Sequence, residues 1–115
     1  MAKSKIFLFK IKGKEWKARC YAPRTYTKMH GSDSAAITVM SDRELHFNTK
    51  YLSLDYIQHE LWHAFTYESN TNSSYLSNDQ MEELSATIFS NHGLEIIALS
   101  IEIQQQFLTK DEEWL

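Results

Sequence analysis

The spacing of apolar residues changes at about Ser53, and this change limits the folds open to the chain. Residues 5–12 are rich in β-formers, and residues 15–21 alternate apolar with polar side chains, as in a half-buried strand. From Ser53 onward the apolar residues recur at helical spacing. A β-rich first half and an α-rich second half predict an α+β fold, with helices on one face of a small antiparallel or mixed sheet.

Turn and cap residues divide the two halves into elements. Gly13-Lys14 is expected to close a hairpin between the first two strands, because glycine supplies the positive φ that a tight turn needs. The segment with the only proline is expected to be a loop, and about three helices are expected in the second half. These expected elements are a loop at 22–34, strands at 36–40 and 44–48 with a turn at 41–43, and helices at about 54–68, 78–92 and 94–110.

Length and composition indicate one soluble domain covering residues 1–115. Apolar residues make up 43% of the chain, and a net charge of −3 provides no attraction for nucleic acid or an anionic membrane. Cys20 is the single cysteine and is expected to be a buried thiol. The lysine-interrupted apolar run at 5–12 is too short for a signal peptide or a membrane span, so we expect a cytoplasmic protein.

The sequence HELWH, residues 59–63, lies within the first expected helix. At about 100° per residue, His59 and His63 lie ~40° apart on one stripe, away from the apolar side of the helix. Neutral imidazoles one turn apart suit a tetrahedral zinc ion, with Glu60 beside its water. The short motif also arises by chance in helices that bind no metal, so the rest of the chain decides its meaning.

A second helix downstream offers a third ligand. Ser77 and Gln80 have capping-box spacing at its start, and Gly93 is expected to end it. Glu82 lies over small residues that would allow another helix to approach, whereas Glu83 lies over polar residues expected to face water. We therefore expect Glu82 to point inward as the third ligand, with Glu83 as the alternative.

These residues resemble the glutamate-liganded branch of the zincin superfamily. In that branch HExxH is followed by a second helix carrying Glu-x-[Phe/Leu]-[Ser/Ala], and here residues 82–85 read Glu-Glu-Leu-Ser, with eighteen residues between His63 and Glu82. The chain is similar in size to the compact zincins of bacteria and their phages, including relatives of the ImmA/IrrE peptidases. The resemblance covers residues 56–85. Metzincins require Gly and His where this chain has Thr66 and Ser69.

The resemblance implies a zinc-dependent metallopeptidase acting on a protein or peptide. His59, His63 and Glu82 would bind Zn²⁺, and Glu60 would act as the general base for peptide-bond hydrolysis. Zincins commonly pair an extended substrate with an edge strand, and either 36–40 or 44–48 would serve. Tyr67, Tyr75 and His92 remain alternative candidates for stabilising the oxyanion.

Two other classes of function stay open. One is a zincin-fold binding or regulatory protein whose zinc is structural and which cuts nothing. The other is an interaction module without metal, in which HELWH is accidental. The three tryptophans, Trp16, Trp62 and Trp114, are expected to serve in packing rather than in a ligand cage.

Overall fold

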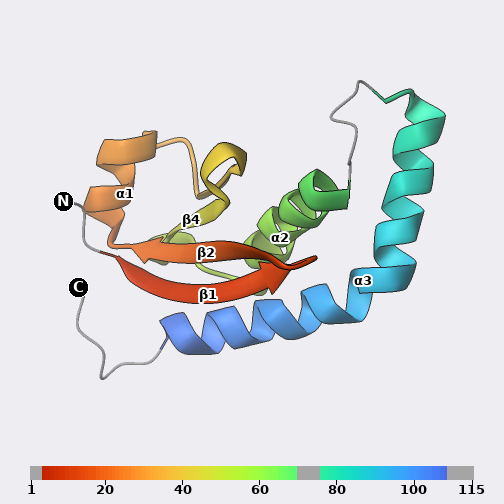
Figure 1. Ribbon diagram of the computed structural model, residues 1–115. Helices are drawn as coiled ribbons and strands as arrows, with labels where there is room; N and C mark the ends of the chain where they lie inside the picture. The colour runs from red at the N-terminus through yellow and green to blue at the C-terminus, as the bar shows by residue number, and fades with distance from the viewer. Residues whose placement is uncertain (1–3, 70–75, 109–115) are drawn as a thin grey trace.

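The computed structural model describes residues 4–69 and 76–108 and confirms the α+β fold. A four-stranded mixed sheet occupies the first half of the chain, and two of the three α-helices follow it (Figure 1). The elements are β1 (Lys5–Ile11), β2 (Lys14–Tyr21), α1 (Pro23–His30), β3 (Ala36–Val39), β4 (Glu44–Asn48), α2 (Leu54–Ser69) and α3 (Asn78–Phe107), with short 3₁₀ turns at Met40–Asp42 and Thr49–Tyr51.

β1 and β2 form the expected hairpin, but its turn lies one residue earlier than predicted. Ile11 pairs with Lys14, so the turn residues are Lys12 and Gly13, with φ of 50° and 79°. Two positive φ values match the two-residue turn whose twist fits flanking strands. The glycine was read as the first turn residue, whereas it occupies the second.

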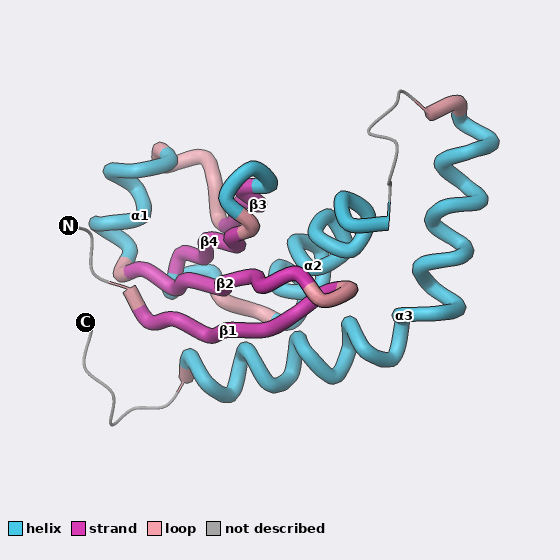
Figure 2. The backbone as a smooth tube through the Cα atoms, viewed as in Figure 1, coloured by secondary structure: helices cyan, strands magenta, loops and turns pink. Residues whose placement is uncertain are grey.

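The strand order is β1-β2-β4-β3, in which β2 and β4 run parallel and the other pairs antiparallel (Figure 2). Parallel neighbours cannot be joined by a tight turn, and residues 22–43 supply the longer connection. The prediction of a loop throughout residues 22–34 is wrong, because this connection contains α1. Pro23 occupies the first turn of α1, where its missing N–H costs nothing, and Tyr26 is fully buried.

The core lies between one face of the sheet and the helices α2 and α3. Trp16, Ala18 and Cys20 alternate inward along β2 and are fully buried, as the sequence predicted. The Trp16 indole Nε1 donates to Glu68 Oε1 of α2 at 3.0 Å, which ties the hairpin to that helix. Trp62 is partly buried against the same core, and Trp114 lies outside the described residues.

On the face of the sheet opposite the core, a network of polar side chains holds β4 in place. Arg19 Nε donates to Glu44 Oε1 at 3.0 Å, and His46 Nε2 lies 2.7 Å from the same oxygen. His46 Nδ1 in turn lies 2.9 Å from His30 Nε2 of α1. Burial alone would raise the pKa of Glu44, but the hydrogen bonds with His46 and Arg19 lower it below its usual range. The network fixes α1 and β4 together and so positions β3 beyond them.

α3 is one continuous helix, and the prediction that Gly93 ends a helix is wrong. Ser77 and Gln80 form the predicted capping box at its start. Gly93 has no positive φ, which a glycine that terminates a helix normally adopts. Ile88 and Ile96, on either side of it, are buried, so core contacts outweigh the low helix propensity of glycine. Figure 1 shows that α3 changes direction part-way along; we call residues 78–93 the arm.

Gly93→Ala is expected to stabilise the protein by about 0.5–1 kcal/mol, because alanine loses less backbone entropy in a helix. A Cβ at this position meets only the Phe89 side chain, at an ordinary contact distance of 3.8 Å. Urea unfolding measures the change, with Ala98→Gly in the same helix as the reverse control. A loss of stability for Gly93→Ala would mean that α3 requires glycine where it changes direction.

Candidate functional site

α2 presents the HELWH motif as its sequence predicts. The Ser53 hydroxyl accepts a hydrogen bond from the backbone N–H of Tyr56 at 3.3 Å, so Ser53 caps the first turn. The apolar side of the helix is buried, whereas His59 and His63 are exposed. The buried apolar residues are Ile57, Leu61, Ala64 and Phe65. Because α2 packs through its apolar side, the two imidazoles are both exposed to solvent on the same stripe of the helix.

The two imidazoles meet at their Nε2 atoms, which lie within hydrogen-bonding distance of each other. Their Nε2 atoms lie 3.1 Å apart, and the ring planes meet at 82°. Two nitrogen ligands of one tetrahedral zinc, each at about 2.0–2.1 Å, lie ~3.3 Å apart. The donor type and the spacing of His59 and His63 thus fit two ligands of a single zinc ion.

Glu60 lies beneath the histidines with its side chain against β3. It is 6% exposed, and its Oε1 accepts a hydrogen bond from the Thr38 hydroxyl at 2.7 Å. The same hydroxyl lies 3.3 Å from the backbone carbonyl of Glu60. Sequence reasoning missed Thr38, because a threonine in a short strand gives no sign of which helix residue it faces. The contact fixes one carboxylate oxygen and locks β3 onto α2.

β3, rather than β4, is the free edge of the sheet next to the motif (Figure 2). Of the two strands expected to pair with a substrate, only β3 has a free edge, because β4 is paired on both sides. Two adjoining cavities of about 470 and 310 Å³ follow β3 and share Ala36, His59 and Glu60. The first is also lined by Asp33, Ser34, Ala35, Asp55 and Tyr56, and the second by Ile37, Thr38, Met40 and His63. We call this continuous depression the β3 groove.

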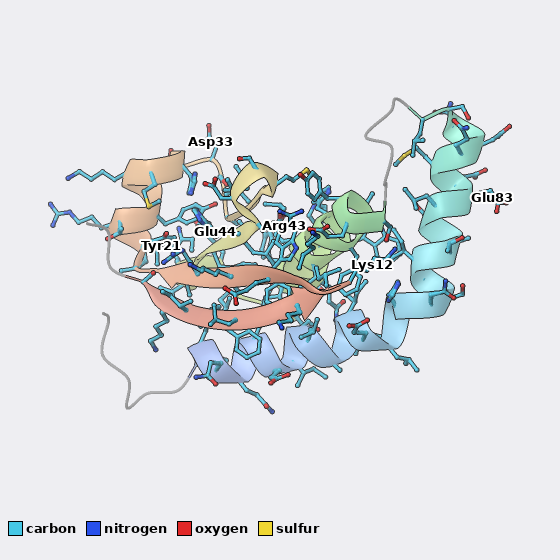
Figure 3. The ribbon with its side chains drawn as sticks, viewed as in Figure 1. Lys12, Tyr21, Asp33, Arg43, Glu44 and Glu83 are labelled. Atoms are coloured by element: carbon cyan, nitrogen blue, oxygen red, sulfur yellow. The ribbon has the colours of Figure 1, made fainter. Side chains whose placement is uncertain are left out.

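Glu82 does not reach the histidines. Its side chain is exposed on the arm, contrary to the expectation that it points inward. Glu83 is also exposed, and Figure 3 shows it pointing away from the sheet and α2. Within residues 4–69 and 76–108, no three His, Cys, Asp or Glu side chains gather closely enough to hold a metal ion. The side of the arm that packs against α2 and the core carries Leu84, Ile88 and His92, and Glu82 lies on a different side of the helix.

The residues considered for oxyanion stabilisation lie elsewhere. Tyr67 packs edge-on against Trp16, and His92 packs on Phe65 and pairs with Glu95. Tyr75 is outside the described residues.

Two other tyrosines, Tyr56 and Tyr26, also lie close to the motif. Tyr56 lines the β3 groove, and its position one turn before His59 is the sequence signal that would have found it. Tyr26 is buried and bonds Ser34; burial raises the pKa of its hydroxyl, and the charge of Glu60 raises it further. Of these tyrosines, Tyr56 is the one whose side chain borders the groove.

Comparisons of this chain with protein families, with curated proteins and with solved structures return no match.

Proposed function

We propose that this protein is a zinc-dependent metallopeptidase that cuts an extended peptide in the β3 groove. The observation that carries the proposal is the arrangement around α2: two imidazole Nε2 atoms 3.1 Å apart, beside a buried carboxylate, along a free strand edge. In this proposal the imidazoles would bind the metal, the carboxylate would act as the base, and the strand edge would hold the substrate. The resemblance to zincins supports the same assignment.

Each residue has a distinct role in this proposal. His59 and His63 would hold zinc, which when bound lowers the pKa of water and polarises a scissile carbonyl. Glu60 would accept a proton from the attacking water and deliver it to the leaving amine. Thr38 would act as a positioning residue, because its hydroxyl holds Glu60 Oε1 and leaves Oε2 for proton transfer.

The substrate would bind by strand addition. β3 offers unpaired backbone groups on its outer side, next to the histidines and Glu60. An extended peptide paired with residues 36–39 would place one of its carbonyls over the motif. Asp33 and Asp55 line the larger cavity of the groove, so we expect a basic substrate side chain to be favoured there.

A peptide-binding protein that does not cut is the second candidate. The exposure of Glu82 favours it, because no third protein ligand accompanies the histidines among the described residues. In this alternative the β3 groove would still capture an extended segment, and neither zinc nor hydrolysis would be required. Turnover measured with a Glu60 variant separates the two candidates.

Metal content tests the site. We expect the purified protein to bind one zinc, and His59→Ala or His63→Ala to lose it after dialysis, because one remaining imidazole is a weak site. His92→Ala is the matched control, since His92 lies away from the β3 groove. If Glu82 is the third ligand, Glu82→Ala loses zinc and Glu83→Ala does not. A wild-type chain that takes up no zinc would contradict the proposal.

A further inference from the structure

The part of α3 that covers the sheet is apolar on two sides. Ile96, Ile103 and Phe107 are buried against the sheet and α2. On the opposite side, four large apolar side chains face water: Leu94 is 85% exposed, Ile97 46%, Ile101 42% and Leu108 56%. A helix that is apolar on both sides is ordinarily covered on both. Among the described elements, none lies on the outer side of α3 (Figure 1).

The exposed apolar residues, together with the half-buried Gln104, follow the repeat of a coiled coil. Positions 94, 97, 101, 104 and 108 are separated alternately by three and four residues, and only Gln104 among them is polar. On a helix these positions fall within about 80° of one another, so they form one narrow stripe. We call these five residues the α3 seam. A seam of this pattern is complementary to another helix with the same spacing.

We propose that the α3 seam binds the α3 seam of a second copy of this chain, antiparallel, across a twofold axis near Ile101. A seam that fits its own copy forms a closed, isologous pair. Ile101 is the middle of the five positions, so Leu94 of one copy would lie opposite Leu108 of the other. The buried core of each copy stays intact, because Ile96, Ile103 and Phe107 face the other way.

The charged residues of α3 favour a second copy of the chain over a lipid surface as the partner of the α3 seam. By length and composition alone, α3 is the one described helix long and apolar enough to cross a membrane. Helices that lie on membranes carry Lys or Arg on their polar side, whereas residues 78–107 contain none and carry five acidic residues. The seam itself has no charged residue, so a second helix can cover it without desolvating a charge.

The same charges favour the antiparallel arrangement. Asp79, Glu82 and Glu83 crowd the start of α3, and its last turns from Ile103 to Phe107 carry no charge. A parallel pair would place the two acidic arms at the same end of the dimer, whereas an antiparallel pair places them at opposite ends. Opposed helix dipoles add to this preference.

Association can be measured by analytical ultracentrifugation from low to high micromolar concentration. We expect the wild type to dimerise, and Ile97→Glu and Ile101→Glu to raise the dimer dissociation constant at least ~100-fold, since each buries a charge in the seam. Met29→Glu, at an α1 position also 42% exposed, is the matched control and should dimerise as the wild type does. Circular dichroism confirms that each variant folds. A monomeric wild type, or seam variants that dimerise unchanged, would overturn the proposal.

Two further measurements test which partner binds the α3 seam and whether the paired helices run antiparallel. Leu94→Cys and Leu108→Cys proteins should form a disulfide with each other in a mixture, and neither should do so alone; efficient self-crosslinking of each would overturn the antiparallel pair. Cys20 does not interfere, because it is buried and burial raises its pKa to about 11. Co-sedimentation with phosphatidylcholine vesicles that is lost in Ile101→Glu would assign the seam to lipid and overturn the proposal.

Discussion

Glu60→Gln is expected to lower peptide hydrolysis by about 10²–10⁴-fold while leaving bound zinc unchanged. Glutamine has nearly the shape of glutamate, and its amide oxygen can still accept the Thr38 hydroxyl at the position of Oε1. It cannot take a proton from water. Turnover of an unstructured protein substrate, followed by mass spectrometry, gives the rate, and metal analysis of the same sample gives the zinc content.

Glu15→Gln is the control for this experiment, because Glu15 is an exposed carboxylate on β2 away from the β3 groove. It should leave both turnover and zinc unchanged. Hydrolysis that survives in Glu60→Gln would exclude Glu60 as the base. A zinc-loaded wild type that binds peptides in the groove and cuts none of them would favour the binding protein over the peptidase.

Trp16→Ala is expected to destabilise the fold by about 3–5 kcal/mol, which is the usual cost of removing a buried aromatic side chain. Trp16 is fully buried, stacks with Phe9, and meets Tyr67 edge-on. Its indole also donates to Glu68 Oε1, and Arg43 Nε donates to the same oxygen. Domains of this size have about 5–15 kcal/mol of stability in total, so a large fraction would be lost.

Urea unfolding measures the effect, and Trp16→Phe separates its two parts. Phenylalanine keeps most of the apolar contact but removes the Nε1 donor to Glu68 Oε1. Because Arg43 still pairs with Glu68, we expect Trp16→Phe to cost only about 1–2 kcal/mol. Equal losses for both variants would mean that the hydrogen bond, not the packing, joins the hairpin to α2.

Local patterns were sufficient where neighbouring residues determine the structure. The hairpin strands, the buried face of β2, the cap at Ser53 and the capping box at Ser77 all follow from residues a few positions apart. The placement of His59 and His63 off the core face follows in the same way, from the period of a single helix. Each of these features is predicted by residues that lie close together in the sequence.

Local patterns failed where distant contacts decide. Gly93 was expected to end a helix, but buried contacts of Ile88 and Ile96 carry α3 through it. The segment with Pro23 was read as a loop, but burial of Tyr26 and the contact between His30 and His46 stabilise a short helix. In both cases tertiary packing outweighs a weak local preference.

By itself, the sequence determined that the protein is α+β, that α2 carries two histidines on one stripe, and that Glu60 lies beside them. Only the tertiary structure decided that β3 is the free edge, that Thr38 holds Glu60, that Glu82 stands exposed on the arm, and that α3 leaves an apolar seam uncovered. The reason is physical. The period of a helix relates residues within one element, whereas the order of strands and the packing of helices depend on which apolar surfaces bury one another.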